Sequence, residues 1–302
     1  MNTEEKVRVQ VQDRQLVVSN LSKVLYPSHG FTKAQVIEYY LRIAPVLLPH
    51  IKNRPLTLKR YPDGVESPFF YQKNVPLGTP DWVPTATVPA PGSTMDREQV
   101  EYVVAGDLPT LIWAANLANL EIHTPQWRLP LDEGRTPDPD LLVFDLDPGP
   151  PATIVECCEV AQLLRPVLQE HGFEPFAKTS GNKGMQLLAA IDGHSSAAAS
   201  GLAKQIAEEL AATHPRRVTA KMTKSLRARK VFIDWSQNNA FKTTVAPYSL
   251  RARNSPTVST PVSWDEVADC TEPLQLQFTS REVLDRLEER GDLLAQLVGE
   301  QD

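Results

Sequence analysis

The sequence predicts a globular protein of mixed α/β class, and three observations support this prediction. Its 302 residues are 41% hydrophobic, which is enough to bury one large core or two packed ones. Short apolar runs at 141–147 and 231–235 are typical of buried strands. Longer segments at 155–168 and 197–212 repeat apolar residues at helical spacing. Strands and helices therefore alternate in the second half of the chain.

The first half predicts a hairpin, a helix and a largely irregular region. Apolar residues alternate at 7–11 and again at 16–18, and Thr32 precedes a helical repeat as an N-cap. The many prolines and aromatic residues of 55–91 predict short strands and loops, whereas 108–122 predicts one buried helix. We expect this half to form a layer of its own.

The second half begins after a segment without periodicity. Residues 129–140 contain Pro, Gly and acidic residues, so we place a connection or subdomain boundary there. Further along, 175–191 predicts two strands around a Gly-rich turn, and 243–246 predicts one more strand. A last helix is expected over 281–297, broken near Gly291. The boundary divides the chain into subdomains of about 1–135 and about 140–302 within one domain, 1–302.

Composition indicates a cytoplasmic protein. The start MNTEEKVRVQ is polar, and apolar runs such as 43–48 are short and interrupted by proline, so neither a signal peptide nor a membrane span is expected. Cys157, Cys158 and Cys270 lack metal-ligand spacing. We expect them to be inert core thiols in a reducing compartment.

The net charge of −6 hides a strong local asymmetry. Between Pro215 and Arg253 there are ten Lys and Arg residues and one acid, Asp234, which leaves 21 basic and 36 acidic residues elsewhere. A solvated charged face is the usual reason for such a window. Here an apolar strand pattern interrupts the window beside its one carboxylate, which favours a cleft for polyanions.

Three aspartates are the candidate metal ligands. Asp145 and Asp147 are two apart on an expected strand, so their side chains share one face at its end. Asp234 ends a second apolar strand. Each could instead be a turn former, or Asp234 could pair with Arg227 or Arg229. Three converging carboxylates would bind two divalent cations and support phosphodiester chemistry.

A phosphatase is the alternative interpretation of Asp145-Leu-Asp147. In haloacid-dehalogenase-like enzymes the first aspartate is phosphorylated and the second is the general acid. Gly149 stands where that family has Thr or Val, which counts against this alternative.

The turn Ser180-Gly-Asn-Lys-Gly184 offers groups that hold phosphate oxygens. A hydroxyl, free backbone amides and the Lys183 ammonium occur together, without the spacing of a P-loop. By itself the segment would be interpreted as a simple hairpin turn.

Seven ordered blocks of sequence resemble the polymerase domain of bacterial DNA ligase D, in the archaeo-eukaryotic primase superfamily. The similarity extends over nearly the whole chain, and seven blocks are far more specific than one motif. The blocks are SNLSKVLYP (19–27), LKRYPDG (58–64), EIHTPQWR (121–128), FDLDPG (144–149), TSGNKG (179–184), MTKSLRARKVFIDWSQN (222–238) and VAPYSLRAR (245–253).

The resemblance implies an α+β fold with a primase-like catalytic core. That core would contain a sheet like that of an RNA-recognition motif, with an N-terminal subdomain packed alongside. By position, the three aspartates match the family's metal ligands, manganese being preferred and magnesium possible. The resemblance also implies contacts with the incoming nucleoside triphosphate, ribo or deoxyribo, for Lys59, His123, Ser180, Lys183, Gln186, Gln237 and Arg251.

Contacts with DNA are implied as well. Asn20, Lys23 and Lys33 match a pocket for a 5′-phosphate at a gap, and Phe70 and Tyr71 match aromatics that stack on template bases. Arg227 matches a position that helps to place primer or nucleotide. Without the resemblance, these would be surface lysines, core aromatics and a solvated arginine, and His123 would be a core histidine.

One position departs from the family pattern, because Gln186 stands where the family has histidine. Glutamine still donates a hydrogen bond but carries no charge. The leading hypothesis is a template-dependent nucleotidyltransferase that fills gaps and extends 3′ ends in bacterial end joining, near the nucleoid, with Ku and a DNA ligase as partners. The alternatives are a non-catalytic module that bridges DNA ends and a stand-alone primase-polymerase.

Overall fold

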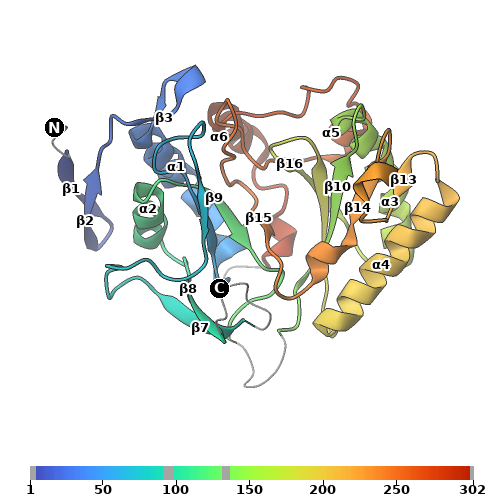
Figure 1. The fold of residues 1–302 in the computed structure, drawn as a ribbon, viewed down its shortest axis with the longest axis horizontal. Coiled ribbons are helices and arrows are strands. Elements are labelled where there is room, and N and C mark those ends of the chain that lie inside the picture. Colours follow the sequence, from blue (N-terminus) through green and yellow to red (C-terminus); the bar gives the residue numbers. More distant parts are fainter. Residues whose placement is uncertain (1–4, 91–97, 131–136, 300–302) are drawn as a thin grey trace.

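The computed structural model describes residues 5–90, 98–130 and 137–299, and it has two lobes built around separate hydrophobic cores (Figure 1). Of the expected boundary at 129–140, positions 131–136 lie outside the described residues, as do 91–97 of the expected irregular region. No helix in the described ranges is both long and apolar enough to cross a membrane.

The N-terminal lobe combines a four-stranded sheet with two helices and three small hairpins. The sheet has the order β15-β9-β5-β6, and α1 packs against α2 on one side of it. In chain order the elements are β1 (Lys6–Val11), β2 (Arg14–Ser19), β3 (Val24–Tyr26), η1 (Pro27–His29), β4 (Phe31–Thr32), α1 (Lys33–Ile51), β5 (Thr57–Arg60), β6 (Phe70–Gln72), β7 (Thr85–Pro89), β8 (Gln99–Val103), α2 (Leu108–Asn116) and β9 (Asn119–Thr124).

Helix α1 begins where the sequence predicts. The Thr32 hydroxyl accepts a hydrogen bond from the Gln35 backbone, and the Gln35 side chain accepts one from the Thr32 backbone. This reciprocal pair satisfies donors that the first helical turn leaves unpaired. The first hairpin is also confirmed, with Val11 opposite Arg14 at its turn.

The single helix expected over 108–122 is wrong. Helix α2 ends at Asn116, and Ala118 has a left-handed backbone with φ of 56°. The Ala118 carbonyl accepts a hydrogen bond from the Tyr61 backbone, and the chain continues as β9, paired with β5. The apolar repeat is the same for a buried helix and a fully buried strand, so pairing with β5 decided the outcome.

The C-terminal lobe is a six-stranded sheet with two long helices on its outer face (Figure 1). The strand order is β13-β14-β10-β12-β11-β16, and only β13 and β14 run parallel. The remaining elements of the chain, in order, are β10 (Leu141–Pro148), α3 (Ile154–Glu170), β11 (Phe176–Thr179), β12 (Met185–Ala190), α4 (Ser196–Thr213), β13 (Val218–Thr219), η2 (Lys224–Leu226), β14 (Val231–Asp234), η3 (Trp235–Asn238), β15 (Thr244–Val245), β16 (Pro261–Val262), α5 (Trp264–Ala268), α6 (Ser280–Arg290) and η4 (Ala295–Leu297). Of these, β15 belongs to the four-stranded sheet of the N-terminal lobe.

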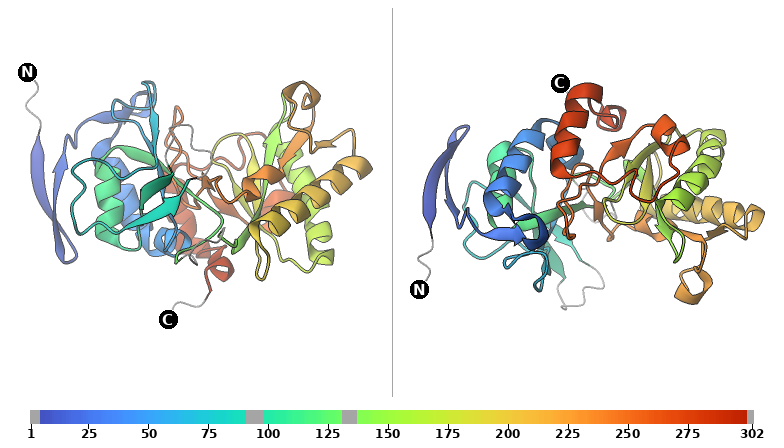
Figure 2. Two further views of the ribbon diagram at one scale, coloured as in Figure 1. Left: turned by 60° about the horizontal axis from the view of Figure 1, so that its bottom comes forward. Right: turned by 90° about the horizontal axis from the view of Figure 1, so that it is seen from above.

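The C-terminal part of the chain joins the two lobes. After β14 it crosses to pair β15 with β9, then returns to the six-stranded sheet as β16 (Figure 2). Tyr248, Leu250 and Val258 are buried in the core of the N-terminal lobe. Helix α6 ends at Gly291, as the sequence predicts, and Leu294 then packs on the inner face of the six-stranded sheet.

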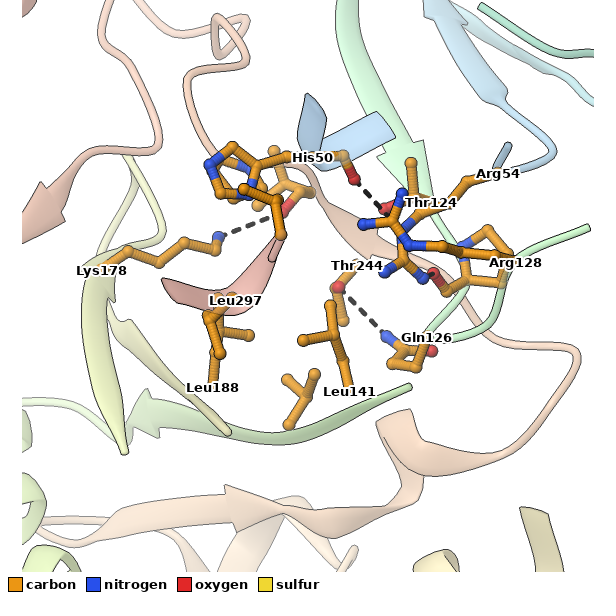
Figure 3. Close-up of a pocket in the computed structure, with 15 residues that line it drawn as sticks. His50, Arg54, Thr124, Gln126, Arg128, Leu141, Lys178, Leu188, Thr244 and Leu297 are labelled. Carbon is orange, nitrogen blue, oxygen red and sulfur yellow. Dashed lines mark hydrogen bonds between the residues drawn. The ribbon is translucent and has the colours of Figure 1, made fainter. Parts of the chain in front are cut away.

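Buried cations line the seam between the lobes (Figure 3). The Lys178 ammonium, in β11, donates to the Val245 carbonyl at 3.0 Å and to the Ser259 hydroxyl at 2.7 Å. Burial lowers its pKa to about 7. Arg54 is 1% exposed and makes two hydrogen bonds to Asp140, which also accepts from Arg128. These bonds hold the end of α1 against the start of β10.

We predict that Asp140→Ala lowers the free energy of unfolding by about 3 kcal/mol, because it leaves the Arg54 guanidinium buried without its counter-charge. Chemical denaturation measures this. Glu288→Ala is the matched control, since its pair with Arg42 is exposed on both sides and should contribute less than about 1 kcal/mol. Equal losses in both variants would contradict the prediction.

Candidate functional site

Strand β10 places two aspartates on the inner face of the six-stranded sheet. Leu142, Phe144 and Leu146 point into the core beneath α3 and α4 and are fully buried. Because side chains alternate along a strand, Asp145 and Asp147 point to the opposite face. That face turns toward the N-terminal lobe.

Neighbouring strands bring two further predicted residues to Asp145. In the antiparallel register, Asp145 lies opposite Gln186 of β12 on one side and opposite Asp234 of β14 on the other. Side chains of directly opposite residues lie on the same face of a sheet. The Gln186 amide donates to Asp145 Oδ1 at 3.0 Å. The structure therefore brings the three predicted aspartates onto adjacent strands.

On this face, negatively charged carboxylates lie close together with little access to water. Loss of hydration, the charge of Asp147 and then that of Asp234 raise the pKa of Asp145 to about 7, against the hydrogen bond from Gln186. The pKa of Asp147 is also raised, by loss of hydration and then by Asp234, while Arg227 lowers it. A cation bound here would relieve this repulsion.

The side chain of Asp234 is engaged with its own turn. Its Oδ1 accepts from the Ser236 backbone at 3.1 Å and from the Ser236 hydroxyl at 2.5 Å, and its Oδ2 accepts from the Gln237 amide at 2.8 Å. Within the described ranges no ion pair joins Asp234 to Arg227 or Arg229. Gln237 thus lies beside the aspartates, bonded to one of them.

The three carboxylates suit a hard divalent cation, because all of their ligand atoms are oxygens and their negative charges repel one another. In the present side-chain arrangement, no group of three or more His, Cys, Asp or Glu side chains in the described part of the chain is arranged to hold a metal ion. Hydrogen bonds from Ser236 and Gln237 engage both carboxylate oxygens of Asp234 and tie this side chain to its own turn. The metal ligands remain a prediction.

The turn 180–184 packs directly against the end of β10. The Ser180 hydroxyl accepts from the backbones of Asn182 and Gly184, so the turn is internally bonded. A Cβ at Gly184 would lie 2.1 Å from the Leu146 carbonyl oxygen. A Cβ at Gly181, where φ is 65°, would lie 2.7 Å from Arg251 Cγ. Only glycine allows this approach, and Lys183 is exposed in this turn near the end of β10.

Three other predicted residues meet at a residue that the sequence reasoning missed. Glu121 of β9 has a side chain only 2% exposed, surrounded by Lys59, His123 and Arg251. The distances from its carboxylate oxygens are 3.3 Å to Lys59 Nζ, 2.9 Å to His123 Nε2 and 3.5 Å to Arg251 Nε. A signal was present, because Glu121 and His123 alternate on one face of an apolar strand.

Aromatic rings extend this cluster to the surface. Phe70 and Tyr71 of β6 are 44% and 56% exposed, so neither ring is packed in the core. Arg60 lies over the Phe70 ring at 5.1 Å, and the Lys59 ammonium lies over the Phe69 ring at 4.3 Å. Stacking surface remains available on these rings.

The predicted phosphate pocket is assembled by backbone bonds. The Lys23 backbone donates to the Asn20 carbonyl, and the Lys33 backbone donates to the Lys23 carbonyl. The Lys23 ammonium pairs with Asp63 at 2.7 Å. Lys33 is 5% exposed and its ammonium donates to the Ser19 carbonyl at 2.6 Å, so it is not an ordinary surface lysine.

Arg227 lies on the other side of the aspartates, in the basic window. Its guanidinium lies 3.6 Å from the centre of the Phe232 ring and donates to the Met222 carbonyl at 2.6 Å. A Cβ at Gly149 would lie 1.9 Å from the Arg227 carbonyl oxygen, so this loop presses closely on the end of β10. The basic window is thus in contact with the end of β10, the strand that bears Asp145 and Asp147.

Comparison with known proteins finds relatives over most of the chain. Residues 32–294 match the family model described as LigD, primase-polymerase domain. The multifunctional non-homologous end joining protein LigD of Mycolicibacterium smegmatis is 46% identical over 281 residues, covering 93% of this chain and 36% of that protein. The bifunctional LigD of Bacillus subtilis is 31% identical over 278 residues, covering 91% and 43%. The chain therefore spans less than half of these relatives.

A solved structure agrees with the sequence matches. The polymerase domain from Mycobacterium tuberculosis Ligase D, solved in complex with DNA, superimposes with a TM-score of 0.88 at 42% identity. The match covers 95% of this chain and 99% of that one. The mixed α/β architecture is therefore that of a solved polymerase domain.

We predict that Asp145→Asn stabilises the metal-free protein, by an amount that grows with pH. Folding raises the Asp145 pKa from 3.8 to about 7, so the wild-type contribution is complete below pH 3.8 and is lost as pH rises through 7. The variant has no such loss. We expect the variant to raise the free energy of unfolding by about 2 kcal/mol at pH 8 and by almost nothing near pH 4. The gain at pH 8 is smaller than the full pKa shift would give, because part of the Asp145 side chain is exposed to water.

Thermal unfolding at both pH values, with a chelator present, measures this difference. Asp285→Asn, at an exposed position of α6, is the control and should change little at either pH. A variant that loses stability at pH 8 would show that Asp145 is not strained by its neighbours.

Proposed function

The chain belongs to the family of LigD primase-polymerase domains, and on that premise we propose that it is a metal-dependent, template-directed nucleotidyltransferase. It extends 3′-hydroxyl ends and fills gaps at breaks in DNA. The observation that supports this most is the register of Asp145 with Asp234, beside a turn that offers Lys183 and close to Arg251. Carboxylates and phosphate donors on one face suit phosphoryl transfer.

The proposed division of labour follows from position and charge. Asp145, Asp147 and Asp234 would hold two divalent cations, with manganese preferred. Such cations, when bound, stabilise the attacking and leaving oxygens of an in-line displacement. Ser180, Lys183 and Arg251 neutralise the triphosphate, and Gln186 and Gln237 orient the carboxylates to which they are hydrogen-bonded.

The remaining predicted residues handle the nucleotide and the DNA. Lys59 and His123 line the nucleotide pocket, and Arg227 places the primer end. Phe70 and Tyr71 stack on template bases. In this proposal, a 5′-phosphate at a gap is bound where the backbone brings together Asn20, Lys23 and Lys33.

The sheet suits a core like that of an RNA-recognition motif. Along the chain the elements β10, α3, β11, β12, α4 and β14 follow the order βαββαβ, and the four strands lie side by side as β14-β10-β12-β11. In that motif the open face of a four-stranded sheet binds nucleic acid. Here the face that α3 and α4 leave uncovered bears the aspartates, and Leu294 packs on another part of it.

The biological setting is part of the same proposal. The relatives are named as non-homologous end joining proteins, and each is longer than this chain. We propose that the chain acts in bacterial end joining near the nucleoid, with Ku and a DNA ligase, on broken ends that carry a 5′-phosphate.

We expect Asp147→Ala to reduce nucleotide incorporation by roughly 100-fold or more, because it removes a ligand to cations that contribute several kcal/mol to the transition state. The assay is extension of a gapped primer with manganese and nucleoside triphosphates. Asp285→Ala is the control and should keep wild-type rates. Full activity of Asp147→Ala would contradict the proposed site. Wild-type protein that binds gapped DNA but incorporates nothing would favour a bridging module instead.

We also expect Phe70→Ala to weaken binding of a template overhang by about tenfold, since stacking on one base contributes roughly 1–3 kcal/mol. Fluorescence anisotropy with a labelled overhang measures this. Leu77→Ala, at an apolar position that is fully exposed, is the control. Equal affinities for the two variants would count against template stacking.

A further inference from the structure

Glu121 is a buried carboxylate that accepts hydrogen bonds from Lys59, His123 and the Ala252 backbone and forms an ion pair with Arg251 at 3.5 Å. Lys59 lies directly opposite it in the register of β5 and β9, and His123 lies two positions further along β9 on the same face. The backbone of Ala252 donates to Oε1 at 3.1 Å, on the side of the carboxylate that also faces Lys59. Oε2 faces His123 and Arg251. A buried charge is tolerated when it is paired in this way.

The ionisation state of Glu121 determines which hydrogen bonds its neighbours can make with it. Burial opposes ionisation, but the hydrogen bond from His123, the charge of Arg251, the charge that His123 carries when protonated and the charge of Lys59 outweigh it and lower the pKa of Glu121 to about 2. The carboxylate is therefore an acceptor only. Burial lowers the pKa of His123, so near neutral pH the ring is uncharged and has one N–H.

These two facts determine the tautomer of His123. Its Nε2 lies 2.9 Å from an acceptor-only oxygen, so Nε2 must carry the hydrogen and Nδ1 must be the unprotonated acceptor. The groups around the ring are Glu121, Lys59, Arg251 and the Tyr71 ring, whose centre lies 6.1 Å from that of His123. Of these, Glu121 alone is a carboxylate.

We propose that Glu121 is a positioning residue of the nucleotide pocket, which orients Lys59 and Arg251 and holds His123 as the Nε2–H tautomer. The proposal rests on the proposed function, in which these three residues contact the nucleotide. Glu121 itself acts through them. Its carboxylate also keeps three cationic or protonatable groups together that would otherwise repel one another.

Replacing Glu121 with glutamine makes a distinct chemical prediction. Lys59 and the Ala252 backbone can only donate, so the amide oxygen of Gln must stay on their side. The amide nitrogen then faces His123 and Arg251. Arg251 cannot accept a hydrogen bond and moves away, whereas His123 can accept one by transferring its hydrogen to Nδ1. Glu121→Gln therefore inverts the His123 tautomer and releases Arg251.

The experiment compares wild type, Glu121→Gln, Glu121→Asp and Asp140→Asn. Ring nitrogen NMR shifts of isotope-labelled His123, assigned with His123→Gln, report the tautomer in the full chain. Fluorescence titration with a labelled nucleoside triphosphate, and steady-state extension, report nucleotide and primer binding. Asp140→Asn is the matched control, because Asp140 also binds two arginines but lies at the seam.

We expect wild type and Glu121→Asp to show the Nε2–H form and Glu121→Gln to show the Nδ1–H form. We also expect the nucleotide KM of Glu121→Gln to rise about tenfold, with the primer KM unchanged, because charged hydrogen bonds are lost. Asp140→Asn should lose stability only. A merely structural Glu121 would behave like Asp140.

An Nδ1–H tautomer in the wild type overturns the proposal, even if Glu121→Gln does not fold. An unchanged tautomer together with an unchanged nucleotide KM in a folded Glu121→Gln also overturns it. Wild-type protein that shows the expected tautomer but never extends a primer contradicts the proposed function instead. The two failures are therefore distinguishable.

Discussion

The alternation of side chains along β10 is the constraint on which the rest of the structure depends. Leu142, Phe144 and Leu146 are fully buried beneath two helices, and this fixes which face Asp145 and Asp147 must occupy. A slip of one residue would bury both carboxylates in an apolar core, at a cost of several kcal/mol each. The packing that fixes this register therefore also fixes the position of the candidate site.

The same strand limits what can lie next to it. Positions 149 and 184 require glycine, because the backbone oxygens of Arg227 and Leu146 occupy the space that a Cβ would take. The basic window and the turn 180–184 consequently approach the strand end that bears the aspartates. Close backbone approach is what gathers groups that are far apart in the sequence.

Two carboxylates illustrate how surroundings set ionisation. Asp145 lies among other carboxylates with little water, and its pKa rises to about 7. Glu121 is as well enclosed, but cations and a backbone N–H surround it, and its pKa falls to about 2. The first arrangement stores repulsion that a cation can relieve, and the second orders the groups around it.

The sequence by itself determined much of the C-terminal lobe and the set of candidate site residues. The apolar run before Asp145, the cap at Thr32 and the glycine break at Gly291 are local features, so their physics is visible without the fold. The glycine-rich turn 180–184 is equally local. Ordered sequence blocks then related the chain to its family.

The tertiary structure alone decided where α2 ends, which residues join the lobes and what Glu121 does. A buried helix and a buried strand have the same apolar pattern, and pairing with β5 selected the strand. Glu121 resembles any acid on a strand until the register brings Lys59 opposite it and the crossing segment adds Arg251. Contacts between segments far apart in the chain depend on register and packing, which no local pattern encodes.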